Sequence, residues 1–250
     1  MFRKFLPRKE NETQADQQKR EALTRNIAQK AKKQGNYQLA SHLYLQLGEK
    51  LKVAKCLVKL GDADKVITFA NNARDPQIYV LSANFLQNSD WHNSPEIMKA
   101  ITSFYSKAKA WDYLSGFYDA CAAVEIDEYR DYEKAMAALK EAMKHAQKVV
   151  GDSREQRIAM LEKKLFLIDK FLQTRALAAS DPGEMIRQCQ QLLENPNVET
   201  AVRAGDVYAQ MIEVLYEHNK LDQAYMLIKE MQKKGMIWNP YLDAEMVIYL

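Results

Sequence analysis

Apolar side chains recur along the chain at the spacing of an α-helix. One run is Ala110, Leu114, Phe117, Cys121 and Val124, which follow i, i+4, i+7, i+11 and i+14. Similar runs occupy residues 132–146 and 158–172, and the segments VITFA and QIYVLS lie inside helical stripes. No segment alternates convincingly as a strand. The pattern predicts an all-α chain of about a dozen antiparallel helices.

A short turn pattern recurs between these stripes. The segment GNYQLA at 35–40 has relatives that begin at residues 61, 89, 109, 130 and 219. Its first residue ends a helix, with Gly where a positive φ is needed. The aromatic and the residue three positions later face the same side of the next helix. Around the first copy, small residues resemble the hairpin of tetratricopeptide (TPR) repeats. We therefore expect antiparallel hairpins in a TPR-like superhelical solenoid.

Helix starts are marked by polar capping residues, four of them followed by Pro at the first helical position. The marks are Asp75-Pro76, Ser94-Pro95, Asp181-Pro182 and Asn195-Pro196, with capping boxes at Asp181/Glu184 and Ser153/Gln156. The run at 158–172 predicts a helix of roughly 25 residues. We expect a flexible polar N-terminus at 1–20, short TPR-like hairpins at 21–150, longer helices at 151–234 and an apolar tail at 235–250.

The segment FYDACAAVEIDEYRDYEKA, residues 117–135, contains six acidic residues and raises the question of a metal or acid/base site. A calcium loop needs a glycine at its sixth position and a glutamate at its twelfth, and this segment has neither. Asp127 and Asp131 are placed to cap the following helix. We interpret the cluster as a bend between two helices.

Other candidate chemistry is equally sparse. The four histidines stand alone, the three cysteines are scattered without a C-x-x-C pair, and no Gly-rich loop could hold phosphate. We predict no enzyme activity, no metal and no cofactor, with Cys121, Trp91 and Trp111 in the core. A net charge of +3 from 36 basic and 33 acidic residues argues against nucleic acid. No apolar run is long enough for insertion into a membrane.

Three stretches carry a family resemblance that generic TPR patterns would not give. They are GNYQLASHLYLQLGEKLKVAKCLVKLGDADKVITFA, NFLQNSDWHNSPEIMKAITSFYSKAKAWDYLSGFYDACAAVEIDEYRDYEKA and DPGEMIRQCQQLLENPNVETAVRAGDVYAQMIEVLY. Across residues 28–234 the chain resembles the C-terminal helical-repeat region of the intraflagellar transport protein 140 family. The most specific parts are EIMKAITSFYSKAKAWDYLSGFYDACAAVEIDEY and RAGDVY.

The resemblance implies a non-catalytic scaffold or adaptor in intraflagellar transport complex A. Such a subunit serves retrograde ciliary transport and the entry of membrane cargo, at the cilium or flagellum and the basal body, on the cytoplasmic side. The implied partners are other complex A subunits, which are WD40/TPR solenoid proteins. Family members carry WD40 propellers ahead of the helical part, and this chain resembles that helical part alone. The alternative is a vesicle-coat or attachment-factor adaptor outside cilia.

The last sixteen residues are rich in large apolar side chains, more than one face of a terminal helix can hide. We interpret them as a candidate partner-binding surface formed by Trp238, Tyr241, Leu242, Met246, Ile248 and Tyr249. Weak self-association is one use of such a surface. The alternative is that the tail folds back and covers the last hairpin.

Overall fold

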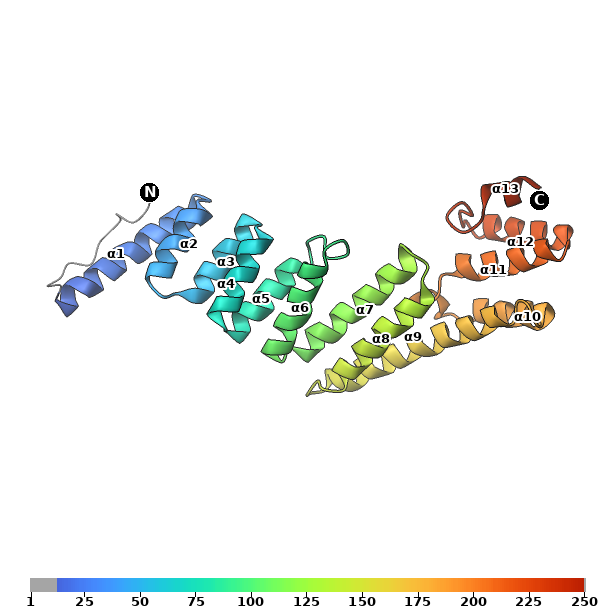
Figure 1. Ribbon diagram of the computed structural model, residues 1–250, viewed down its shortest axis with the longest axis horizontal. Coiled ribbons are helices and arrows are strands. Elements are labelled where there is room, and N and C mark those ends of the chain that lie inside the picture. Colours follow the sequence, from blue (N-terminus) through green and yellow to red (C-terminus); the bar gives the residue numbers. More distant parts are fainter. Residues whose placement is uncertain (1–12, 250) are drawn as a thin grey trace. The chain divides into compact units, whose positions relative to one another are not determined.

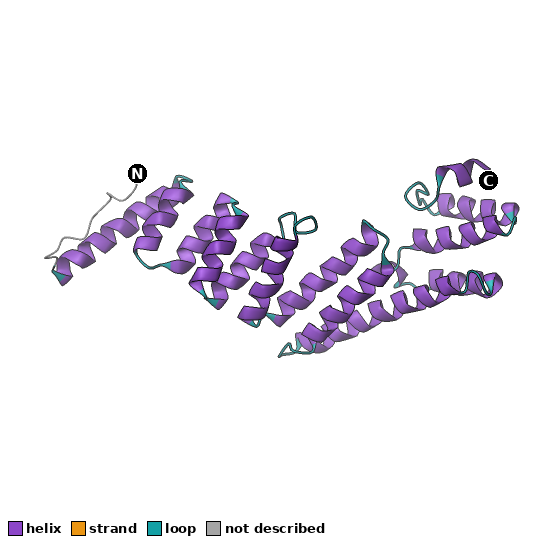
Figure 2. Ribbon diagram, in the orientation of Figure 1, coloured by secondary structure: helices purple, strands orange, loops and turns teal. Residues whose placement is uncertain are grey.

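The computed structural model describes residues 13–249, which form thirteen α-helices and one short 3₁₀ turn (Figure 1). Figure 2 shows that this described part contains helices and loops but no strand. The prediction of an all-α, TPR-like fold is therefore confirmed. The chain divides into two compact units, one ending at Ala110 and the other beginning at Trp111.

Each unit is a series of helices that pack mainly on their neighbours in sequence. The first contains α1 (Gln14–Lys33), α2 (Tyr37–Gln46), α3 (Lys50–Leu60), α4 (Ala63–Ala73), α5 (Pro76–Leu86) and α6 (Pro95–Ala108). The second contains α7 (Trp111–Asp127), α8 (Tyr132–Ala146), α9 (Ser153–Ala176), α10 (Pro182–Leu193), the 3₁₀ turn η1 (Val198–Thr200), α11 (Ala204–Glu217), α12 (Leu221–Lys233) and α13 (Ala244–Tyr249).

The recurring turn has one backbone geometry. Its first residue is left-handed, and a new helix begins two positions later. The residues in this conformation at the predicted turns are Gly35, Gly61, Lys109, Arg130 and Asn219, with φ between 54° and 77°. The copy at residue 89 is the exception, because Ser89 is not among the residues with positive φ and the helix begins only at Pro95.

The turns also satisfy the last carbonyls of the preceding helix. The amide of Asn36 donates to the carbonyl of Ala31 at 2.9 Å, and the amide of Ala110 donates to Tyr105 at 2.9 Å. This bond from the residue after the left-handed one to the last turn of the helix is the Schellman arrangement. It reverses the chain within a few residues, so that successive helices run antiparallel.

The predicted helix starts are partly correct. Asp75, Ser94 and Asp181 cap α5, α6 and α10, each with Pro at the start of the helix. The fourth mark is wrong: Asn195 accepts from the amide of Asn197 at 2.9 Å inside a turn, and η1 follows instead of an α-helix. Ser153 is the first residue of α9 and does not cap it.

The N-terminal part of the chain is helical earlier than expected. We expected a flexible segment over residues 1–20, but α1 begins at Gln14 and Thr13 caps it through the amide of Asp16. Residues 1–12 lie outside the described part. The expected long helix is α9, with 24 residues. The boundary between the two compact units lies between Ala110 and Trp111. The boundary expected near residue 150 concerned the length of the helices, which is a different property.

The predicted core residues of α7 differ in their burial. Cys121 is 7% exposed, and burial raises the pKa of its thiol to about 12. Trp91 is also buried, in the loop before α6. The prediction is wrong for Trp111, which is only partly buried because it is the first residue of α7. One ring face lies against His145, and the ammonium of Lys148 lies 4.7 Å from its ring centroid.

His145 is stacked between two aromatic rings of α7. Its centroid lies 5.8 Å from that of Trp111 and 5.6 Å from that of Tyr118, with interplanar angles of 5° and 10°. The buried Nδ1 atom has no hydrogen-bond partner among the described residues. Burial lowers the pKa of His145 and Lys148 adds to the effect, whereas Glu141 opposes it. The neutral imidazole therefore fits the folded chain better than the cation.

The burial of Cys121 leads to a stability prediction. Cys121→Asp places a carboxylate in the apolar layer of unit 2 and should lower the free energy of unfolding by about 3 kcal/mol or more. Ala120→Asp, on the exposed side of the same helix, should cost only about 0.7 kcal/mol from helix propensity. Urea unfolding of the two variants measures the difference. Equal losses would show that position 121 is not buried.

The His145 stack leads to a prediction on pH. The pKa is lowered in the folded chain, so the unfolded chain binds more protons below its ordinary pKa of about 6.5. The contribution of His145 is complete above that pH and is lost as the pH falls toward the lowered value. The parent should therefore lose more stability than His145→Phe between about pH 7.5 and pH 5 in urea unfolding. Parallel losses in both proteins would contradict the prediction.

Candidate functional site

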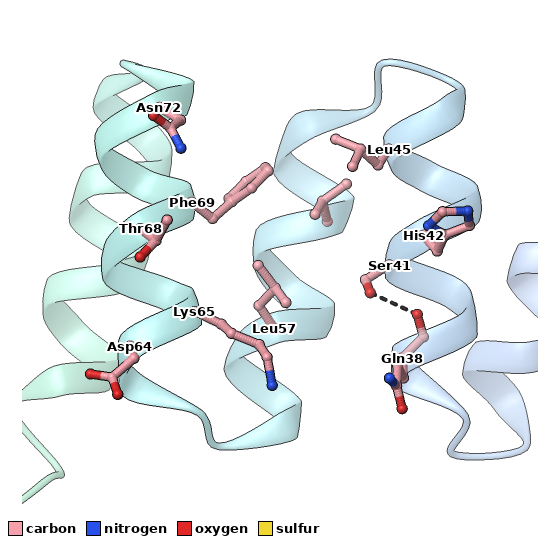
Figure 3. A pocket seen from close by; sticks show the side chains of 11 residues that line it. Gln38, Ser41, His42, Leu45, Leu57, Asp64, Lys65, Thr68, Phe69 and Asn72 are labelled. Carbon is pink, nitrogen blue, oxygen red and sulfur yellow. Dashed lines mark hydrogen bonds between the residues drawn. The ribbon is translucent and has the colours of Figure 1, made fainter. Parts of the chain in front are cut away.

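Unit 1 contains a groove of 480 Å³ between α2 and α4, with α3 beneath it (Figure 3). Its apolar lining is Leu45 from α2, Val53 and Leu57 from α3, and Phe69 from α4. Figure 3 shows Phe69 pointing from α4 toward the space between the helices. Leu45 is 55% exposed, so its side chain is available to a ligand.

The sides of the groove are polar. They carry the side chains of Gln38, Ser41, His42, Thr68 and Asn72, and Asp64 and Lys65 add one charge of each sign at the start of α4. These amide, hydroxyl and imidazole groups both donate and accept hydrogen bonds. The Ser41 hydroxyl already donates to the carbonyl of Gln38 at 2.8 Å. An apolar floor between sides that carry both donors and acceptors suits a peptide segment, whose backbone needs both.

Unit 2 contains a buried carboxylate, that of Asp206 on α11, which is 5% exposed. Its Oδ2 accepts from the Tyr132 hydroxyl at 2.5 Å, and Arg130 pairs with its Oδ1. The Tyr132 oxygen in turn accepts from the amide of Arg203 at 3.1 Å. Burial raises the pKa of Tyr132, so the hydroxyl keeps its proton and remains a donor. The carboxylate is buried but fully engaged, as a buried charge must be.

Arg130 connects this carboxylate to the C-terminal tail. Its Nη1 donates to the carbonyl of Pro240 at 2.9 Å and to that of Tyr241 at 3.3 Å. Its guanidinium carbon lies 5.2 Å from the centroid of the Tyr241 ring. Arg130 itself is in the left-handed conformation, with φ of 54°. One arginine in the α7–α8 turn thus joins α11 to the tail. We call Arg130, Tyr132, Asp206 and Tyr241 the Asp206 node.

Gly205 makes room for the tail. A Cβ atom at this position would collide with the ring of Tyr241, so that ring lies directly on the backbone of α11. The segment RAGDVY, singled out in the sequence, therefore has a structural role. Arg203 pairs with Asp127 at 2.6 Å, and the Tyr208 hydroxyl donates to Glu230 at 2.6 Å.

The six candidate residues of the tail are placed in different surroundings. Leu242 is 6% exposed and belongs to the core of unit 2, which favours the fold-back alternative for this residue. Trp238, Tyr241 and Met246 are partly buried against the same core. Ile248 is 83% exposed and Tyr249 is 74% exposed. These two remain candidates for contact with a partner.

The acidic residues of the segment 117–135 have several different structural roles. Asp131 caps α8 by accepting from the amide of Lys134 at 2.9 Å, as expected. Asp127 does not cap α8, because it is the last residue of α7 and pairs with Arg203. Asp119 pairs with Lys164 at 2.6 Å. Within residues 13–249, no group of three His, Cys, Asp or Glu side chains could hold a metal ion.

A second, polar cleft of 360 Å³ borders the Asp206 node. Arg130 and Arg175 line it together with Asp206 and Glu213. Two guanidinium groups and two carboxyl groups balance in charge. Burial raises the pKa of Glu213, and Arg130 opposes that rise. The cleft therefore offers no excess charge of either sign to a small ion.

Among the described helices, none has the length and apolar character required to cross a membrane.

The contact between Gly205 and Tyr241 leads to a double-mutant prediction. Gly205→Ala should destabilise the parent, because the added methyl displaces the Tyr241 ring. In a Tyr241→Ala background the same change should stabilise by up to about 1 kcal/mol, since alanine favours the helix more than glycine does. Urea unfolding of the four proteins gives the sign in each background. A change of the same sign in both would show that the ring does not occupy this place.

Two family models match the chain, and their boundaries agree with the division into units. The model of the TPR domain shared by intraflagellar transport proteins 140 and 172 matches residues 2–104. The model of the C-terminal TPR domain of intraflagellar transport protein 140 matches residues 112–232. The interval between the two matches contains the division at Ala110 and Trp111. Because these two adjoining models account for most of its length, the chain belongs to the TPR-like helical region of the intraflagellar transport protein 140 family.

Proposed function

We propose that the chain is a non-catalytic scaffold of intraflagellar transport complex A and that the groove between α2 and α4 receives a segment of another subunit. Through this contact it takes part in complex assembly for retrograde ciliary transport and for the entry of membrane cargo. Its place of action is the cilium or flagellum and the basal body, on the cytoplasmic side. The family match supports the link to intraflagellar transport, and TPR-type domains are typically scaffolds.

The groove is the observation that carries this proposal. Leu45 exposes more than half of its side chain beside Leu57 and Phe69. Full burial of a leucine side chain contributes about 1.5–3 kcal/mol, so covering the exposed half of Leu45 contributes roughly half of that. The amide and hydroxyl groups of its sides can pair with the backbone of an inserted segment without the cost of desolvating a full charge. The exposed Ile248 and Tyr249 offer a second, smaller contact on unit 2.

The test compares two substitutions of similar exposure. Leu45→Asp puts a carboxylate in the groove, whereas Leu23→Asp puts one on α1, where Leu23 is 51% exposed outside the groove. Both sites are at the surface, so both proteins should fold like the parent in circular dichroism. Tagged full chains are mixed with recombinant complex A subunits, and bound subunits are quantified.

Leu45→Asp should weaken capture of at least one subunit by about tenfold or more, which corresponds to a loss of about 1.4 kcal/mol. Leu23→Asp should bind like the parent. Unchanged capture by Leu45→Asp would exclude the groove as the docking site. Failure of the parent chain to capture any complex A subunit would overturn the assignment to that complex.

A further inference from the structure

The near-balanced charge of the chain conceals two oppositely charged halves. Residues 1–110 contain 19 basic and 10 acidic residues, a net charge of +9. Residues 111–250 contain 17 basic and 23 acidic residues, a net charge of −6. These two ranges are the two compact units, and within the first the residues 62–110 are balanced, with five basic and five acidic residues. Each unit therefore has its own electrostatic character, which the total of +3 hides.

The excess positive charge is concentrated in α1 to α3. Residues 22–61 contain a single acidic residue, Glu49, and eight basic ones: Arg25, Lys30, Lys32, Lys33, Lys50, Lys52, Lys55 and Lys59. Glu49 is already held by Arg25 at 2.8 Å and by Lys52 at 2.6 Å. It therefore has little capacity to neutralise the other lysines.

Five of these lysines form a surface that we call the basic ridge: Lys30, Lys32 and Lys33 on the last turn of α1, and Lys55 and Lys59 on α3. All five are exposed, and none forms an ion pair within residues 13–249. The helices share a core that includes Ala31 and Cys56.

Helix geometry separates the ridge from the groove. Val53 and Leu57 of α3 line the groove, whereas Lys55 and Lys59 are two positions further along and point to the opposite side of the helix. A ligand in the groove and a ligand on the ridge therefore occupy different faces of unit 1. The docking proposed for the groove does not use the ridge.

The acidic counterpart is present on the same chain. Residues 125–133 contain five acidic residues and one basic residue, Arg130, at the turn between α7 and α8. Part of this charge is neutralised, since Asp127 pairs with Arg203 and Asp131 with Lys134. Glu128 is exposed and has no ion-pair partner among the described residues. Unit 2 as a whole remains acidic. Each copy of the chain therefore carries one basic ridge and one acidic unit.

From this charge complementarity we propose that the basic ridge of one copy binds the acidic unit 2 of a second copy. The contact joins two different surfaces, so it is head-to-tail and leaves a free ridge at one end and a free acidic unit at the other. Long-range attraction of this kind is screened by salt. Association should be concentration-dependent and strongest at low ionic strength.

Sedimentation velocity of the full chain tests the proposal. At ~10 mM salt, where the Debye length is about 30 Å, the mean mass should rise with concentration to about twice the monomer value or more. At ~1 M salt, where it is about 3 Å, the chain should be a monomer. A monomer at both salt concentrations overturns the proposal. That result leaves docking in the groove untouched, because capture of another subunit is measured separately.

Charge-reversal variants locate the contact. Lys55→Glu with Lys59→Glu should reduce the association constant by about tenfold or more, since two attractions become repulsions. The matched control, Lys140→Glu with Lys163→Glu, changes the net charge equally but makes unit 2 more acidic. It should associate as well as the parent or better. Equal weakening by both pairs would mean that net charge alone, and not the ridge, controls association.

A mixing experiment excludes damage to the fold. Glu128→Lys with Glu133→Lys should also weaken self-association, because it removes negative charge from unit 2. A mixture of the Lys55→Glu, Lys59→Glu chain with the Glu128→Lys, Glu133→Lys chain should associate more strongly than either chain does alone. Absence of this rescue overturns the pairing of ridge with unit 2. Binding of the parent to anionic phospholipid vesicles without self-association would assign the ridge to a membrane surface instead.

Discussion

The helical hairpins depend on a backbone constraint that recurs between helices: one residue in the left-handed conformation, followed two positions later by a new helix. Glycine adopts this conformation without steric cost, and Gly35 and Gly61 use that freedom. Lys109, Arg130 and Asn219 adopt it with a side chain present, at a cost of order 1 kcal/mol each. The surrounding helices must hold these residues in place. The turns are consequently short, and each helix lies against its predecessor.

Arg130 shows how such a turn can also organise distant parts of the chain. Its left-handed backbone ends the α7 hairpin turn, and its guanidinium reaches Asp206 and the carbonyls of Pro240 and Tyr241. A hydrophobic side chain in its place could not satisfy the buried carboxylate, and removal of one partner of a buried pair costs about 3–5 kcal/mol. The node therefore fixes which surface of α11 faces the α7–α8 turn and where the tail lies. The helices of unit 1 pack mainly on their neighbours in sequence, and its groove and its ridge lie at the surface.

Local sequence signals predicted the parts of the fold that depend on local chemistry. Asp75, Ser94 and Asp181 cap their helices because a short polar side chain before proline favours that geometry wherever it occurs. Asn195 carries the same signal but forms a turn, since the next segment supplies only a 3₁₀ turn before α11. The Asp206 node could not be predicted from spacing, because Arg130 and Asp206 are 76 residues apart. A glycine and an aspartate in the first turn of a largely apolar helix, as in RAGDVY, are the sequence signals that point to such a node. The count of apolar residues in the tail showed that it must be covered, but not by which surface.

The separation of the partners in the Asp206 node has a consequence for synthesis of the protein. During synthesis from the N-terminus, Arg130 leaves the ribosome first. Asp206 follows 76 residues after Arg130, and Pro240 follows 110 residues after Arg130. Hairpins of neighbouring helices can close as soon as their second helix has left the ribosome. The surface of α11 at Gly205 lacks its cover until Tyr241 has emerged. A ribosome that stops between residues 206 and 240 therefore releases a chain whose first unit is complete but whose second exposes the backbone of α11.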